Sequence, residues 1–230
     1  MGMRDPKMHA TIAPQIAALY DLPVAVGVTD PRVAQPEPMG REARHLRRAF
    51  PVRKREFAAG RTAARQAMTA LGRSPEPIPA HPDRAPHWPE GLSGSISHTG
   101  KLCAAVLTTA PFHLGLDMEE NADLEVGLLA TICSDRELAH IDGPYRLRLA
   151  KLIFCAKEAA YKAQYPITRT LFGFDHIEIS LDLAQQRFTA AFTKPVGCFA
   201  VGDKMPGKFD GIEDHLVTAV WTDHGGCKGA

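Results

Sequence analysis

The chain has 230 residues, 45% of them hydrophobic, which is enough to bury the core of one large domain or of two smaller ones. Lys and Arg number 27 against 26 Asp and Glu, so no net charge draws the whole chain to nucleic acid or to a membrane surface. The five cysteines form no Cys-x-x-Cys pair, so we expect neither a disulfide framework nor a zinc site, and we predict a reducing, cytoplasmic location. We also expect no signal peptide and no membrane span.

The charges separate along the chain. Residues 41–73 hold ten Lys or Arg against two Glu, whereas residues 111–145 hold eight Asp or Glu against one Arg. A basic block and an acidic block can bind a polyanion and a cation respectively. Two solvated faces would have the same composition.

The first half of the chain begins with a predicted short helix over residues 12–20 and an apolar strand over residues 22–28. Residues 41–71 read as helical, with a break near Pro51. An apolar stripe of this helix is flanked by Arg53, Arg61 and Arg65. Arginines that converge from one helix can clamp a phosphate through forked hydrogen bonds, although a solvated basic face is the alternative.

A predicted hairpin follows. One strand ends near Ser97, Thr99-Gly100 makes the turn, and residues 102–108 return. Ser97 and His98 therefore lie beside a turn, where polar side chains often meet ligands. Ordinary turn chemistry explains the pair equally well.

Residues 112–119 alternate in polarity and predict a strand on which Gly115, Asp117 and Glu119 share one face. Two carboxylates at this spacing repel each other unless a cation lies between them. Mg²⁺ commonly takes one or two carboxylates together with phosphate oxygens. The alternative is an exposed acidic strand end.

Residues 149–165 predict a helix that Pro166 stops, because the run is rich in Ala, Leu and Lys and has no internal Gly or Pro. Glu158 and Lys162 are four residues apart, so their charged groups face the same space. An exposed ion pair would account for that spacing alone. The apolar positions lie on another stripe of the helix, at Leu152, Ile153, Ala156, Ala160 and Ala163.

Four short strands complete the chain, near residues 177–181, 188–192, 199–201 and 216–221. Helix and hairpin are thus followed by strand, helix and more strands, which predicts an α+β fold in which one unit of structure is used twice. No sequence repeat accompanies it.

Several motifs resemble one family when they are taken together. They are Arg55-Glu56-Phe57 with Gly60-Arg61, Trp88-Pro89 with Ser97-His98, Gly115-Leu116-Asp117-Met118-Glu119, and residues 154–163. In this order and spacing the chain resembles the 4′-phosphopantetheinyl transferase superfamily, in its long monomeric class. The resemblance implies two pseudo-symmetric halves, each a small antiparallel sheet packed with a long helix. Residues 1–110 would bind coenzyme A, residues 111–230 would carry the metal and the catalytic helix, and the ligands would lie in the cleft between them.

The resemblance also implies roles for particular residues. Glu158, Lys162 and Asp117 would be catalytic, with Glu158 as the base for the attacking hydroxyl. Mg²⁺ (or Mn²⁺) would be bound by Asp117, the main-chain carbonyl of Met118, Glu119 and Glu158. The phosphates of coenzyme A would be bound by Arg53, Arg61, Ser97, His98, Lys157 and Lys162. Relatives often have a lysine where Ala80 stands, so His81 or Arg84 would substitute for it.

The implied reaction transfers the phosphopantetheine arm of coenzyme A to a serine of an apo acyl or peptidyl carrier protein and releases 3′,5′-ADP. Such enzymes serve siderophore or secondary-metabolite synthesis, and a cytoplasmic monomer with no nucleic-acid or membrane partner is expected. Two alternatives remain: a metal-dependent phosphoanhydride hydrolase, and a non-catalytic coenzyme A-binding relative.

Overall fold

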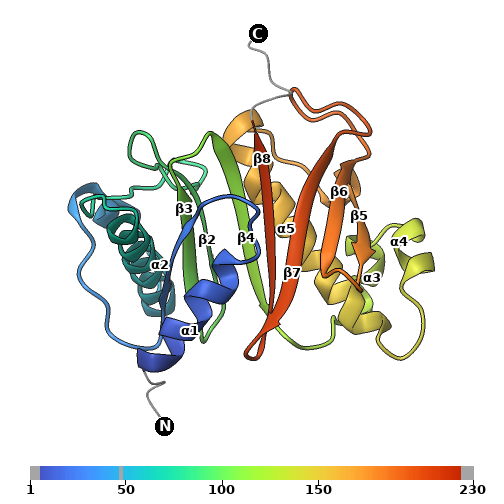
Figure 1. Ribbon diagram of the computed structural model, residues 1–230, viewed down its shortest axis with the longest axis horizontal. Helices are drawn as coiled ribbons and strands as arrows, with labels where there is room; N and C mark the ends of the chain where they lie inside the picture. Colours follow the sequence, from blue (N-terminus) through green and yellow to red (C-terminus); the bar gives the residue numbers. More distant parts are fainter. Residues whose placement is uncertain (1–5, 47–48, 224–230) are drawn as a thin grey trace. The chain divides into compact units, whose positions relative to one another are not determined.

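The computed structural model describes residues 6–46 and 49–223. The chain divides into two compact units, Met1–Ala110 and Pro111–Ala230. Each unit combines an antiparallel sheet with a long helix, which confirms the predicted α+β class (Figure 1).

The first unit contains a three-stranded sheet in the order β1-β3-β2, with every pair antiparallel. Its longest helix is the 20-residue α2, which begins at a proline and ends before Gly72, a residue with φ of +72°. Its elements are α1 (Pro6–Ala17), β1 (Ala25–Thr29), the 3₁₀ helix η1 (Gly40–Leu46), α2 (Pro51–Ala70), β2 (Ser93–His98) and β3 (Cys103–Thr108).

Helix α2 packs closely on β1 because small residues meet at the contact. A Cβ atom placed on Gly27 would lie 1.9 Å from the main-chain oxygen of Ala63, so only glycine allows the two backbones to approach this closely. Buried alanines on the same helix face, together with Met68, Ile78 and Leu107, form the core of this unit.

The second unit contains a five-stranded antiparallel sheet in the order β4-β8-β7-β6-β5, with the 23-residue helix α5 against it (Figure 1). Its strands are β4 (Phe112–Glu120), β5 (Ile177–Asp182), β6 (Arg187–Phe192), β7 (Lys204–Ile212) and β8 (His215–Asp223). Its helices are η2 (Val126–Leu128), α3 (Leu129–Ile132), α4 (Asp135–His140), α5 (Arg146–Thr168) and η3 (Phe174–His176).

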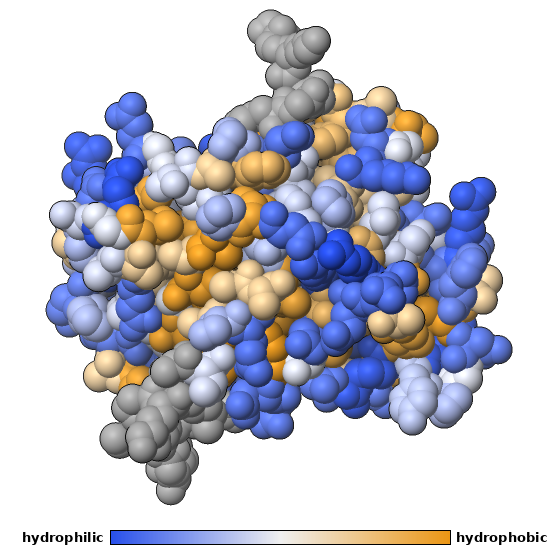
Figure 2. All heavy atoms as spheres, in the orientation of Figure 1, coloured by the Kyte–Doolittle hydropathy of each residue, from blue (hydrophilic) through white to orange (hydrophobic). Residues whose placement is uncertain are grey.

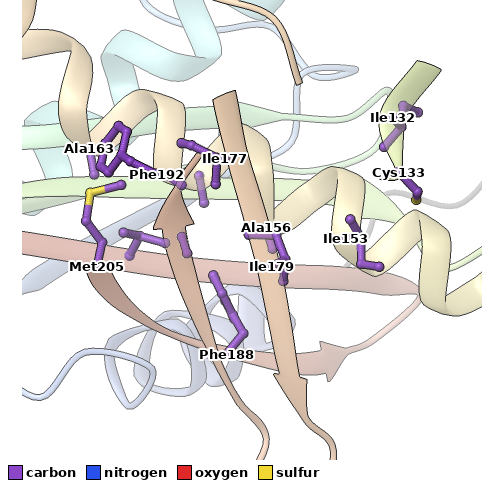
Figure 3. Packing of buried hydrophobic residues seen from close by; sticks show 14 of the residues in the cluster. Ile132, Cys133, Ile153, Ala156, Ala163, Ile177, Ile179, Phe188, Phe192 and Met205 are labelled. Carbon is purple, nitrogen blue, oxygen red and sulfur yellow. The ribbon is translucent and has the colours of Figure 1, made fainter. Parts of the chain in front are cut away.

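Helix α5 repeats the packing seen in the first unit. A Cβ atom on Gly115 of β4 would lie 1.9 Å from the main-chain oxygen of Ala159. The predicted apolar stripe of this helix is buried, from Leu152 to Ala163. Figure 3 shows residues of this stripe packed among side chains of β5, β6 and β7.

Several predictions of helices and strands were wrong. Helix α5 continues past Pro166 to Thr168, because a proline in the last turn removes only one donor and Arg169 N still bonds to Tyr165 O at 2.9 Å. No strand forms at residues 199–201, where Val196 and Phe199 make an isolated bridge instead. Strand β7 was missed, since Pro206 and two glycines within it are typical of turns.

The cysteines also differ from the expectation. Cys198 takes part in a disulfide, whereas Cys103, Cys133 and Cys155 are free and buried. Burial raises the pKa of Cys133 to about 11, and the charge of Glu137 adds to this shift.

Within the described residues, every helix is too short or too polar to cross a bilayer. Figure 2 shows hydrophilic residues over much of one face, with apolar patches between them.

Candidate functional site

An acidic group in the second unit lies where helix α5 covers strand β4. Gly115, Asp117 and Glu119 alternate along one face of β4, and α5 packs on that face at Gly115. The close approach brings the polar side chains of the helix to the two acids. Asp117 is buried and Glu119 is partly exposed.

Two lysines of α5 hold the two strand carboxylates. Lys162 Nζ donates to Asp117 Oδ1 at 2.6 Å and to the main-chain oxygen of Leu116 at 3.0 Å. Lys151 Nζ donates to a carboxylate oxygen of Glu119. The role of Lys151 was missed, although its position on the polar stripe of the helix pointed to it.

Glu158 lies within electrostatic reach of the same group. Burial raises its pKa, the negative charges of Asp117 and Glu119 raise it further, and the positive charge of Lys162 opposes them. Burial lowers the pKa of Lys162, but the charge and hydrogen bond of Asp117 outweigh burial, and the net shift is upward. The charge of Asp117 therefore acts on the protonation of both Glu158 and Lys162, and that of Glu119 acts on Glu158.

The chemistry of these donors fits Mg²⁺ or Mn²⁺, since Asp117, Glu119 and Glu158 offer hard carboxylate oxygens and Met118 offers a main-chain carbonyl between the first two. In this arrangement, however, no set of three acidic, histidine or cysteine side chains within residues 6–46 and 49–223 is gathered closely enough to hold a metal ion. The lysine ammonium groups lie against two of the carboxylates instead. A metal would have to take the place of these ion pairs.

Lys157 is adjacent to Glu158 in sequence but is directed elsewhere. Its side chain is 3% exposed and its ammonium group donates three hydrogen bonds: to Glu137 Oε2 at 2.8 Å and to the main-chain oxygens of Ile132 at 2.8 Å and Phe174 at 3.0 Å. These bonds use all three of its protons. The structure thus does not bring Lys157 to the acidic group, and in this arrangement no proton remains for the predicted bond to a pyrophosphate.

A pocket of about 140 Å³ borders Glu158. Its aromatic wall includes Tyr161 and Phe172, whose rings meet edge to face at 5.2 Å. The remaining lining residues are Lys157, Gly173, Phe174 and Ile177. This wall was not predicted from the sequence, although Phe172 and Phe174, which follow the helix closely, were a signal for it.

In the first unit, two of the predicted phosphate-binding residues meet. Arg53 Nη1 donates to His98 Nε2 at 3.0 Å and to Glu56 Oε2 at 3.3 Å. Ser97, next to His98 at the end of β2, is 5% exposed. The start of α2 and the hairpin end of β2 therefore present a basic group on the surface of this unit.

Arg61 and Arg65 of α2 have partners within the unit. Arg61 is buried, its Nε donates to the main-chain oxygen of Ile78 at 2.8 Å, and its guanidinium lies 4.0 Å from the centre of the Phe57 ring. Burial lowers its pKa to about 10. Arg65 donates to the fully buried Glu42 at 2.9 Å. Arg53 and Arg65 both act electrostatically on Arg61, and the binding of a phosphate by two or three of these arginines stays a prediction.

The substitutes expected for the lysine at Ala80 lie in the irregular segment before β2. The ring of His81 stacks on that of His87 at 4.7 Å. Arg84 has a positive φ of 73° and donates its main-chain N–H to His81 O. A role for either in ligand binding stays a prediction.

Each unit carries charged side chains of the kind found in proteins that bind phosphorylated substrates: carboxylates beside lysines in the second unit, and the basic group of Arg53 and His98 in the first. Comparison with known proteins agrees with this class. Residues 41–108 match a family model described as the 4′-phosphopantetheinyl transferase N-terminal domain, and residues 113–220 match the 4′-phosphopantetheinyl transferase superfamily.

Individual relatives extend the match. The chain is 37% identical over 188 residues to 4′-phosphopantetheinyl transferase Svp of Streptomyces mobaraensis, which covers 78% of this chain and 76% of the relative. It is 33% identical over 180 residues to PptT of Mycobacterium tuberculosis, covering 76% and 78% respectively. Enterobactin synthase component D of Salmonella typhi is 36% identical over 141 residues, covering 59% and 58%. The chain belongs to the 4′-phosphopantetheinyl transferase superfamily and is a transferase.

Proposed function

We propose that this transferase moves the 4′-phosphopantetheine arm of coenzyme A to a serine hydroxyl of an apo acyl or peptidyl carrier protein and releases 3′,5′-ADP. The observation that supports it most is the placement of Glu158 and Lys162, one helical turn apart, against Asp117. A carboxylate whose pKa is raised is a suitable proton acceptor near neutral pH, and a partly buried ammonium is a suitable partner for phosphate charge.

The reaction divides between these two side chains. The serine oxygen attacks the phosphorus that bears the pantetheine, and its proton passes to the carboxylate of Glu158. The bond from that phosphorus to the bridging oxygen breaks, and the ammonium of Lys162 stabilises the charge that appears on the leaving 3′,5′-ADP. Transfer of this kind depends on alignment and charge neutralisation more than on covalent help from the protein.

The first unit contributes the side chains that bind the nucleotide part of coenzyme A. Arg53 and His98 present donors at the surface of this unit, and Ser97 lies beside them. Phosphate oxygens are strong acceptors for such donors. We infer that this basic group, together with Arg61, binds the phosphates of coenzyme A.

The proposed reaction also uses a divalent ion, bound in the second unit. Asp117, Glu119, Glu158 and the main-chain carbonyl of Met118 would hold Mg²⁺ or Mn²⁺, which when bound neutralises the diphosphate of coenzyme A. In the structure Lys162 and Lys151 form ion pairs with Asp117 and Glu119, respectively.

The test is mass spectrometry of an apo carrier protein after incubation with the enzyme, coenzyme A and Mg²⁺. We expect a mass gain of one phosphopantetheine arm, its loss in Asp117→Asn and Glu158→Gln, and its retention in Glu125→Gln, a control at an exposed glutamate. Release of 3′,5′-ADP at the same rate without any carrier protein would identify a hydrolase instead.

A further inference from the structure

A buried ion pair joins Lys157 of α5 to Glu137 of α4. Both residues are 3% exposed and their charged atoms lie 2.8 Å apart. Charges this deep are costly to bury unless each is paired and its remaining hydrogen-bonding groups are satisfied. Each end of this pair meets that condition.

Glu137 is satisfied on both oxygens. Its Oε1 accepts from the main-chain N–H of Ile179 at 2.7 Å, and its Oε2 accepts from that of Ser134 at 2.7 Å as well as from Lys157. Ser134 in turn caps α4 by accepting from Glu137 N at 3.2 Å. One carboxylate therefore ties the start of α4 to strand β5 and to helix α5.

The ammonium of Lys157 extends the same network to two further segments. It holds the main-chain oxygen of Ile132, at the end of α3, and that of Phe174, at the start of η3. Five consecutive elements, from α3 to β5, are thereby joined through two side chains. A network of this kind favours one arrangement of the chain over others, because any alternative leaves a buried charge without a partner.

That arrangement builds the pocket beside Glu158. Lys157 and Phe174 both line the pocket, and the hydrogen bond between them holds the main chain of η3 against α5. The Phe174 ring also packs on Phe154 of α5, with centroids 5.7 Å apart. The part of the wall that comes from the 172–174 segment thus depends on the Lys157 ammonium for its position against α5.

We propose that Lys157 and Glu137 are positioning residues for the transferase reaction, which hold the 172–174 segment against α5 and so set the shape of the pocket that borders Glu158. Lys157 then acts through the protein and makes no bond to the phosphates of coenzyme A. The catalytic part of this inference rests on the proposed function, whereas the energetic coupling of the two residues does not.

The experiment compares Lys157→Met, Glu137→Gln and the double variant with the natural chain. Each single variant leaves a buried charge without its partner, so we expect a lower unfolding midpoint and a lower kcat. In the double variant both charges are gone, so the cost of an unpaired buried charge is removed, although the single amide oxygen can keep only one of the two main-chain N–H donors from which Glu137 accepts. We expect the midpoint to recover, and kcat to rise at least about tenfold above that of Lys157→Met.

Binding of 3′,5′-ADP separates positioning from phosphate binding, because this product carries the nucleotide phosphates without the pantetheine arm. We expect the same affinity, within about twofold, in the natural chain and in all three variants. The matched control is Lys204→Met, at an exposed lysine of β7, which should change neither stability nor kcat.

Three results would overturn the proposal. The first is weaker 3′,5′-ADP binding in Lys157→Met that remains equally weak in the double variant. The others are a double variant no more stable than the single ones, and folded single variants with an unchanged kcat. Should a single variant fail to fold, the double variant still decides the outcome through its midpoint, its kcat and its 3′,5′-ADP affinity. A natural chain that never modifies a carrier protein would refute the proposed function, while the coupling measured by unfolding would stand.

Discussion

Glu158 lies where its own charge is disfavoured, since burial and the charges of Asp117 and Glu119 raise its pKa. An acid whose pKa is higher in the folded than in the unfolded state stabilises the fold below its ordinary pKa, near 4.5, and this contribution is lost as the pH rises through the raised value. Near neutral pH the ionised carboxylate is therefore a cost to stability.

Glu158→Gln should consequently unfold at a higher urea concentration than the natural chain near neutral pH in the presence of a chelator. The advantage should shrink as the pH falls and vanish below about 4.5, while transfer activity is lost at every pH. Urea midpoints measured across this range test it, with Glu125→Gln as the exposed control. Equal midpoints near pH 7 would contradict the electrostatic coupling of the three acids.

Arg61 and Arg53 offer a second contrast, because one is buried and the other exposed. Removing the Arg61 side chain leaves the main-chain oxygen of Ile78 without its donor, a loss of about 1–3 kcal/mol in the free energy of unfolding. Removing Arg53 breaks only surface contacts, worth about 0–1 kcal/mol. Both changes to alanine should weaken coenzyme A binding, but urea unfolding should show a clear loss of stability for Arg61→Ala alone.

The side chains that the sequence revealed are those whose spacing carries chemistry. Asp117 and Glu119 alternate on one strand, and Lys162 follows Glu158 by one helical turn, so local geometry predicts that each pair shares a face. The partner of Lys157 could not be found in this way. Glu137 is twenty residues earlier, and only the folded chain shows that it covers that face of α5.

At the scale of elements, the contact between α5 and β4 decides where Glu158 lies relative to the strand acids. Gly115→Ala would place a methyl group 1.9 Å from Ala159 O, inside the helix backbone, which cannot rotate away as a side chain can. We expect the free energy of unfolding to fall by about 1–3 kcal/mol, as for overpacked cores. We also expect a fall in transfer activity in the protein that remains folded.

The control for this change is Gly127→Ala, where no atom lies within 4 Å of the added carbon and φ is not positive. It should leave both stability and activity unchanged. A Gly115→Ala protein as stable and active as the natural chain would show that α5 can lie further from β4 than the structure indicates.

Elements were predictable where a single pattern governed a stretch of chain. Alternation located β4, and an alanine-rich run without Gly or Pro located α5. Strand β7 was not predicted because one of its glycines is required by a neighbouring strand: a Cβ atom on Gly207 would lie 2.2 Å from the ring of Phe188 on β6. The need for glycine at this position arises from packing between strands, so it produces no periodic pattern in the sequence.

At the scale of the whole molecule, the two units use the same device without sharing a sequence repeat. In each, a glycine on a strand admits the backbone of an alanine-rich helix, at Gly27 with α2 and at Gly115 with α5. Motif order and element type predicted the α+β class. The strand order of the larger sheet was not predictable, since it depends on contacts between residues far apart in the chain.

The separation of charge between the units leads to the last prediction. The basic group around Arg53 and His98 belongs to the first unit, and Asp117 and Glu158 belong to the second, each unit with its own buried core. Substitutions that share no partner side chains usually have additive effects. Asp117 is bonded to a lysine of α5, whereas Arg53 is bonded to a histidine of β2. Binding of 3′,5′-ADP should therefore persist in Asp117→Asn and Glu158→Gln, although neither transfers the arm.

The converse holds for the basic group. Arg53→Ala should lower 3′,5′-ADP affinity and make it less sensitive to salt, because one fewer cation meets the phosphates. Calorimetric titration at low and high NaCl measures both quantities, and Lys204→Met supplies the control for loss of a distant exposed cation. The contrary result is that Asp117→Asn abolishes 3′,5′-ADP binding while Arg53→Ala leaves it unchanged. The nucleotide would then be bound by the second unit through its metal, and the prediction that the first unit binds it would be wrong.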